Sequence, residues 1–106
     1  MRYAALDALA LASLGTAPSV AHAQGAGIEW VILNQEVGEL YLAGDYDRAV
    51  LVAHKALQVA ERNVGPDHPE VATSLENLVD LYRATNRKSE AEALEKRAAA
   101  IRAMKR

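Results

Sequence analysis

The 106-residue sequence contains no cysteine and no phenylalanine. Without cysteine the chain has no disulfide, no thiolate zinc ligand, no thiol nucleophile and no lipid-modified cysteine anchor. Proline and glycine are scarce, with three and six residues, and a composition rich in Ala and Leu favours helices over strands. We expect one all-α globular domain, because the length allows a single domain and 51% of the residues are hydrophobic and 25% charged.

An excess of basic residues is also missing. The formal net charge of −2 argues against a nucleic-acid-binding protein, for which a strong basic excess is expected. No apolar run approaches the roughly 20 residues that cross a bilayer. The sequence therefore predicts neither a nucleic-acid partner nor a stable membrane span.

The common catalytic and cofactor-binding motifs are absent. There is no Gly-x-x-x-x-Gly-Lys loop, no Gly-x-Ser-x-Gly turn and no His-Glu-x-x-His helix. The three histidines, His22, His54 and His68, lie in different contexts and are too few for a metal site. For His54 we expect a partly exposed structural role. We expect no catalytic residue, no metal, no cofactor and no enzymatic activity.

The first 23 residues have the order of a secretory signal peptide. A short basic start at Arg2 precedes an apolar segment from Ala4 to Leu14, a Gly15-to-Pro18 helix breaker and the small-x-small sequence Ala21-His-Ala23. We expect cleavage after Ala23, a domain over 24–106 and a periplasmic or secreted location. An amphipathic N-terminal helix is the alternative, since an aspartate interrupts the apolar segment.

Apolar residues after Gly27 recur at spacings of three, four and seven, the pattern of amphipathic helices. Four such stripes occur, and their ends fall near Gly44, Val64, Asn86 and the C-terminus. The pattern predicts a helix-turn-helix unit that occurs twice, over about 28–64 and 67–104. The stripes consist of Val31, Leu33, Val37, Leu40 and Tyr41; of Ala49, Val52, Ala53, Ala56, Leu57 and Ala60; of Val71, Leu75, Leu78, Leu81 and Tyr82; and of Ala91, Leu94, Ala98 and Ile101.

The two units correspond at a nearly fixed spacing, which indicates a repeat architecture. Ala49 and Ala91 are 42 positions apart, as are Gly44 and Asn86, two residue types that tolerate the left-handed backbone at a helix end. The pair Leu40-Tyr41 matches Leu81-Tyr82 at a spacing of 41. We therefore expect the first inner turn to be one residue shorter than the second, and small residues such as Ala56 to let paired helices approach closely.

These motifs resemble two tetratricopeptide repeats, and more narrowly the longer 42-residue repeats of kinesin light chains and many bacterial repeat proteins. The segments that carry the resemblance are Leu40-Tyr-x-x-Gly-Asp-Tyr-Asp-Arg-Ala49, Lys55-Ala-Leu57, Leu78-x-x-Leu-Tyr-Arg-Ala84, Glu90-Ala-Glu92, Lys96-Arg-Ala98 and the joining Gly65-Pro-Asp-His-Pro69. The resemblance implies an α-solenoid fragment that binds proteins without catalysis. The second repeat departs from the pattern, with Lys88 in place of an aromatic residue and Asn86 in place of glycine.

The joining segment contains an Asp, a His and, shortly after, a Glu, and could be mistaken for a metal or acid-base site. We interpret it as the turn between the repeats: Gly65 ends one helix, Pro66 prevents its continuation, and Pro69 is tolerated in a first turn. We expect Asp67 to cap the next helix, with Glu70 completing a capping box. His68 is expected to pack or hydrogen bond locally.

The resemblance also implies a concave groove lined by the first helix of each pair, where a protein or peptide partner would bind. We predict polar residues of these two helices as the partner-binding set: Asn34, Gln35, Glu36, Asn77, Asp80 and Arg83. Asn77, in Leu75-Glu-Asn-Leu78, is the first candidate, because an Asn in this context in the resembling family often hydrogen bonds a peptide backbone.

Charge is distributed unevenly: five acids and no Lys or Arg lie between Gln24 and Asp47, and eight bases and three acids between Arg83 and Arg106. This indicates either a solvated surface with a basic tail or end-to-end stacking of chains. Two repeats leave both ends uncovered, and we expect exposed apolar residues on the last helix. Homo-oligomerisation, an obligate partner, an accessory-subunit role and a fragment of a longer array remain open interpretations.

Overall fold

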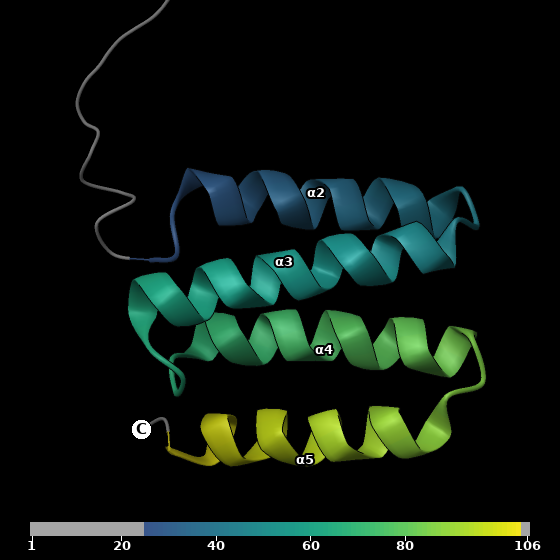
Figure 1. Cartoon of the computed structure of the whole chain (residues 1–106). Helices are drawn as coiled ribbons and strands as arrows, with labels where there is room; N and C mark the ends of the chain where they lie inside the picture. Colours follow the sequence, from purple (N-terminus) through teal and green to yellow (C-terminus); the bar gives the residue numbers. More distant parts are fainter. Residues whose placement is uncertain (1–24, 105–106) are drawn as a thin grey trace, which may run out of the picture.

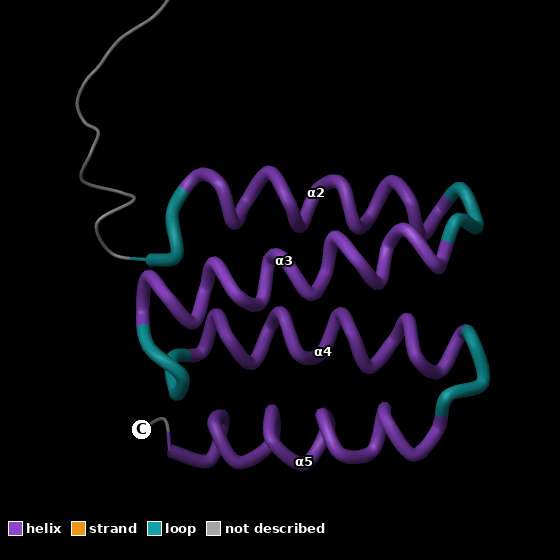
Figure 2. Tube along the Cα trace, in the orientation of Figure 1, coloured by secondary structure: helices purple, strands orange, loops and turns teal. Residues whose placement is uncertain are grey.

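A computed structural model describes residues 25–104, which form four α-helices joined by short turns (Figures 1 and 2). The helices are α2 (Ile28–Leu42), α3 (Tyr46–Val64), α4 (Pro69–Ala84) and α5 (Lys88–Met104). They lie side by side in chain order, each antiparallel to the next (Figure 1). The expected all-α repeat fold is confirmed. The predicted signal peptide, residues 1–23, lies outside the described residues.

The two inner turns have the same length, so the expected one-residue difference is wrong. Three backbone hydrogen bonds close the first turn, and each of them has a counterpart 42 residues later in the second turn. Leu40 therefore corresponds to Tyr82, and Tyr41 to Arg83. In the first turn, the N–H groups of Ala43, Gly44 and Asp45 donate to the carbonyl oxygens of Glu39, Tyr41 and Leu40, respectively. In the second turn, the N–H groups of Thr85, Asn86 and Arg87 donate to those of Leu81, Arg83 and Tyr82.

The same left-handed backbone conformation closes both inner turns. Gly44 has a φ of 80° and Asn86 a φ of 63°, as expected from residue types that tolerate this region. Asp45 then caps α3, where its carboxylate accepts the backbone N–H of Arg48 at 3.4 Å. The sequence thus repeats one turn geometry with two different residues.

The turn between the repeats begins where α3 ends, at Val64, and Gly65 follows with a φ of 87°. The cap of α4 is His68, not Asp67: its Nδ1 accepts the backbone N–H of Glu70 at 3.0 Å. The expected capping box is therefore wrong, because the Glu70 carboxylate accepts the N–H of Ala26 instead of reaching back to its own helix start.

Small residues allow the paired helices to pack closely, as the sequence predicts. Ala49, Ala56 and Ala91 are fully buried, and Ala98 is nearly so. Leucines and valines of α4, including Leu75 and Leu78, fill the centre of the core. The core therefore runs along the row of helices, with α4 between α3 and α5.

The first helix buries only part of its predicted stripe. Leu33 and Val37 are buried and Leu40 is half-buried, but Val31 and Tyr41 are exposed. Trp30, which the stripe did not include, packs against the main core. It also packs against a smaller cluster formed by Leu33, Ala56 and Val59. The prediction that Val31 and Tyr41 are buried was wrong. The helix α2 lies at the end of the row, where only one side of it meets other helices (Figure 1).

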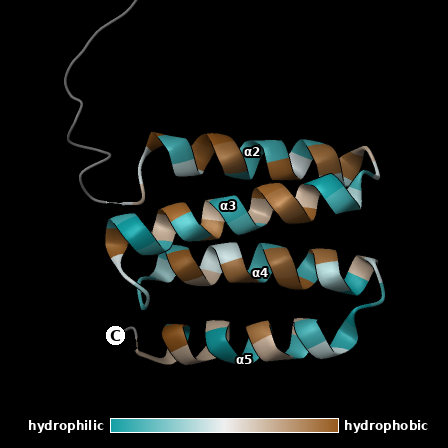
Figure 3. Cartoon of the chain, in the orientation of Figure 1, coloured by the Kyte–Doolittle hydropathy of each residue, from teal (hydrophilic) through white to brown (hydrophobic). Residues whose placement is uncertain are grey.

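The two ends of the row differ in polarity, and α2 exposes more large hydrophobic side chains than α5 does. Along α2, hydrophobic residues recur on turns at the edge of the row (Figure 3). Ile28 is 65% exposed and Ile32 55%. On α5, Met104 is exposed, but Ala91, Ala98 and Ile101 are buried. Between residues 25 and 104 no helix is both long enough and apolar enough to cross a membrane.

Candidate functional site

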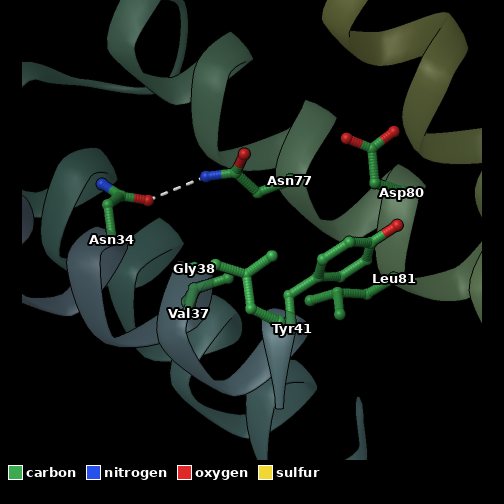
Figure 4. A pocket seen from close by; sticks show the side chains of 8 residues that line it. Asn34, Val37, Gly38, Tyr41, Asn77, Asp80 and Leu81 are labelled. Atoms are coloured by element: carbon green, nitrogen blue, oxygen red, sulfur yellow. Dashed lines mark hydrogen bonds between the residues drawn. The ribbon is translucent and has the colours of Figure 1, made fainter. Parts of the chain in front are cut away.

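An open groove of about 330 Å³ lies between α2 and α4 (Figure 4). One wall comes from successive turns of α2 and the other from α4, because the two helices are the first members of adjacent repeats. The residues that line it are Asn34, Val37, Gly38, Tyr41, Leu42, Asn77, Asp80 and Leu81. The groove therefore combines an apolar floor with two amides and one carboxylate.

Hydrogen bonds between polar side chains tie the two walls together. The Asn77 side chain donates to Oδ1 of Asn34 at 2.8 Å, and Nδ2 of Asn34 donates to the backbone oxygen of Trp30 at 2.9 Å (Figure 4). One turn away, Nε1 of Trp30 donates to the hydroxyl of buried Ser74 at 2.7 Å. These contacts fix the orientation of Asn77 and leave its amide oxygen with no hydrogen-bond donor among residues 25–104.

The structure brings together three of the six residues predicted for partner binding. Asn34, Asn77 and Asp80 all line the groove. Gln35 and Glu36 are exposed on α2 but do not line it. Arg83 donates to Glu95 of α5 at 2.7 Å and does not line the groove. Binding by any of the six residues remains a prediction.

Sequence reasoning missed several groove residues. Tyr41 was assigned to the core, yet it is 40% exposed and packs its ring 5.4 Å from that of Tyr46. Gly38 was not considered, although an isolated glycine inside a helix costs about 1 kcal/mol relative to alanine and calls for a structural reason. A Cβ atom added at Gly38 would meet no atom within 4 Å, so a side chain at this position would extend into the open space of the groove.

The turn between the repeats lines a second hollow, of about 450 Å³. It is formed by residues 64–69 together with Ile101 and Met104. His68 uses Nδ1 to cap α4, which agrees with the expected local hydrogen bond. His54, on α3, is exposed and hydrogen bonds the hydroxyl of Tyr82 at 2.8 Å. Within residues 25–104, no three His, Cys, Asp or Glu side chains gather to hold a metal ion.

The carboxylates with shifted pKa values lie outside the groove. A hydrogen bond from Arg102 holds the pKa of Glu76 below its usual value, against a smaller opposing effect of burial. On α5, the hydrogen bond from Arg87 lowers the pKa of Glu90 in the same way. Both are surface ion pairs that join helices or turns, and neither points to acid-base chemistry.

Comparison with known proteins gives two matches. The chain matches the tetratricopeptide repeat family over residues 31–104. It is also 43% identical over 47 residues to the clustered mitochondria protein of Arabidopsis thaliana, a stretch that covers 44% of this chain and 3% of that protein. The family match spans most of the chain and coincides with helices whose inner turns repeat every 42 residues. The chain therefore belongs to the tetratricopeptide repeat family.

Proposed function

We propose that this protein is a non-catalytic interaction module that binds an extended peptide segment of a protein partner in the groove between α2 and α4. Tetratricopeptide repeats generally mediate protein–protein interactions. The observation that carries the proposal is Asn77: it lines the groove, its orientation is fixed by Asn34, and its amide oxygen faces no protein donor among residues 25–104.

The chemistry of the groove suits a peptide main chain. An amide offers both a donor and an acceptor, so Asn77 can accept a backbone N–H without breaking its bond to Asn34. Gly38 adds no side chain to the opposite wall, which leaves room for the peptide to lie along α2. The apolar side chains of Val37, Leu42 and Leu81 would contact the side chains of the peptide.

Two substitutions test the groove in different ways. Short random peptides displayed on phage are first selected on the full chain, and the selected peptides are synthesised with a fluorescent label.

Asn77→Ala should weaken the binding of these peptides roughly fivefold to tenfold, because it removes one hydrogen bond to the peptide backbone and the link to Asn34. Gly38→Gln should block the groove without unfolding α2, since glutamine is a good helix former.

Gln58→Ala, which changes an exposed residue of α3, is the matched control and should bind peptide as the wild type does. Fluorescence anisotropy measures the affinities, and circular dichroism confirms that each variant is folded. Unchanged affinity in both groove variants would show that the peptides bind elsewhere and would overturn the proposal.

We also propose that the mature protein works in the periplasm or secreted space and belongs to the longer repeat type. The constant spacing of 42 residues between inner-turn hydrogen bonds supports the repeat type. The basic start, apolar segment and small-x-small sequence before Gln24 support export. Expression in a bacterial host should yield a mature chain that begins at Gln24, which mass spectrometry of the intact exported protein would detect. An uncleaved cytoplasmic chain would refute export.

The exposed isoleucines of α2 favour a second function, end-to-end self-assembly. At the repeat spacing of 42 residues, Ile28 corresponds to Glu70 and Ile32 to Ser74. Glu70 accepts a hydrogen bond from Ala26 and Ser74 accepts one from Trp30, so these positions of the second repeat contact the segment that precedes them in the row. A second copy would cover the isoleucines with its α5 end. Charge supports this pairing: Glu36 and Glu39 on α2 and Lys88 and Lys96 on α5 have no ion-pair partner in residues 25–104.

A further inference from the structure

One charged group in the groove has no counter-ion. Asp80 is exposed on α4, and no Lys, Arg or His within residues 25–104 comes close enough to form an ion pair with it. The two amides that line the same groove are already hydrogen bonded to each other. The Asp80 carboxylate is therefore the strongest unsatisfied acceptor that the groove offers to a ligand.

The cations near Asp80 are held by other carboxylates. Arg83, the one base on α4, donates to Glu95 at 2.7 Å, and Arg102 of α5 forms two hydrogen bonds with Glu76 at 3.1 and 2.8 Å. The helix α2 contributes three glutamates and no base. Of the groove-lining residues only Asp80 is charged, and its carboxylate attracts cationic side chains and repels anionic ones.

An aromatic side chain lines the same groove as Asp80. Tyr41 extends from α2 toward α4, and its hydroxyl end lies on the side of Asp80 (Figure 4). Its ring packs against that of Tyr46 at an interplanar angle of 59°, and 40% of the residue is exposed. A guanidinium group can stack on such a ring, and the methylenes that carry it can pack on apolar groove residues such as Leu81.

We propose that the groove is selective for an extended peptide with an arginine side chain, whose guanidinium pairs with Asp80 and stacks on Tyr41. This inference rests on the proposed peptide-binding function and adds the chemistry of the partner. Arginine is preferred to lysine, because its planar guanidinium donates two parallel hydrogen bonds to a carboxylate while it stacks on an aromatic face. Asn77 holds the peptide backbone next to this arginine.

The test uses phage-displayed random peptides selected on the full wild-type chain and, in parallel, on Asp80→Asn. On the wild type, the selected peptides should share an arginine at one position. Replacing this arginine with lysine should weaken binding about threefold, and replacing it with glutamine about tenfold. The Asp80→Asn protein should bind the original peptide about tenfold more weakly and should select peptides without the conserved arginine.

Asp47→Asn is the matched control. Asp47 is an exposed carboxylate of α3 that does not line the groove, so its loss changes the net charge equally and should leave the arginine preference intact. An equal loss in Asp47→Asn would assign the preference to net charge and overturn the role of Asp80. Raising the ionic strength should weaken binding of the arginine peptide more than that of the glutamine peptide.

Two outcomes separate this inference from the function on which it rests. If the selected peptides lose affinity in Asn77→Ala but show no preference for arginine, the groove binds peptides and the role assigned to Asp80 is wrong. If no peptide is selected, or if both Asn77→Ala and Gly38→Gln bind as the wild type does, both proposals fail.

Discussion

Four alanines determine how closely the helices of each pair approach. Ala49, Ala56 and Ala91 are 0% exposed and Ala98 is 2% exposed, so neighbouring side chains contact each of them on every side. Their identity could be predicted from the sequence because they recur every 42 residues on the buried face of two helices. A larger side chain has no free volume to occupy at these positions.

Ala56→Phe should therefore destabilise the fold by about 1–3 kcal/mol through overpacking between α2 and α3. Urea denaturation followed by the fluorescence of Trp30, the single tryptophan, measures the change, since its indole packs between these helices. Ala93→Phe, at an exposed position of α5, is the control and should change the free energy of unfolding by less than about 0.5 kcal/mol. Equal stability of Ala56→Phe and the wild type would contradict this packing.

The cap of α4 shows where residue-level prediction failed and why. Asp67 and His68 are adjacent, and Asp is the more common capping residue. However, His68 precedes Pro69, and the proline ring disfavours a helical conformation for the residue before it. His68 accordingly has φ and ψ angles of −77° and 145°, the extended conformation of a cap. The steric restriction that Pro69 places on His68 outweighed the general preference for Asp as a capping residue. The sequence contained this information, because Pro69 directly follows His68.

At the scale of elements, an ion pair links α4 to α5. Arg102 bonds both carboxylate oxygens of Glu76 and also the hydroxyl of Thr73. The hydrogen bond from Arg102 lowers the pKa of Glu76 in the folded chain. A lowered pKa means that the pair stabilises the fold when the glutamate is ionised, and that this stability is lost as the pH falls through the lowered value.

Glu76→Gln should therefore reduce stability at neutral pH by a few tenths of a kcal/mol to about 1 kcal/mol, because both partners are about half exposed. The difference from the wild type should disappear once the pH falls below the folded-state pKa of Glu76. Urea denaturation at about pH 7 and about pH 3 measures both values. Glu92→Gln changes an exposed residue of α5 that forms no ion pair with another residue of 25–104, and it should show no such pH dependence. A pH-independent difference would contradict the ion-pair account.

The helix α2 shows what periodicity can predict about an element. The spacing of its apolar residues predicted a helix, but it did not distinguish Leu33 and Val37, which are buried, from Val31 and Tyr41, which are exposed. A helix at the end of a row has neighbours on one side only, and the apolar pattern does not record which neighbours are present. For the same reason Tyr41 was placed in the core although it lines the groove.

At the scale of the whole molecule, the two ends of the helix row present different surfaces. On α2, Ile28 and Ile32 are exposed, whereas on the outer side of α4 and α5 ion pairs such as Arg102–Glu76 occupy the surface. The sequence predicted uncovered ends from the number of repeats, but of the apolar residues expected on the surface of the last helix Met104 is exposed and Ala91, Ala98 and Ile101 are buried. Four arginines of the basic segment, Arg83, Arg87, Arg97 and Arg102, are paired with carboxylates.

Self-assembly through this apolar end should be visible by light scattering as a mass that rises with protein concentration. Ile32→Glu should abolish the association, because it places a charge in the contact, and Leu51→Glu, at an exposed site of α3, should not. Moderate salt should weaken the association by screening the contacts between glutamates and lysines. A monodisperse monomer at micromolar concentration in the wild type would contradict end-to-end stacking.

The candidate groove could be predicted in outline only. The family resemblance indicated which helices line it, and three of six predicted residues, Asn34, Asn77 and Asp80, do line it. Gln35, Glu36 and Arg83 do not line it, because the rotation of a helix about its axis depends on its packing partners. Arg83 illustrates this, since Glu95 of the following helix holds it away from the groove.

The central claim, that the groove between α2 and α4 binds peptide, is tested most directly by nuclear magnetic resonance of the full chain titrated with a selected peptide. If the peptide binds in the groove, the largest amide and side-chain shifts should occur at groove-lining residues: Asn34, Gly38, Tyr41, Asn77 and Asp80. Shifts concentrated instead around Gly65 to Pro69 and Met104, the second hollow, would contradict it.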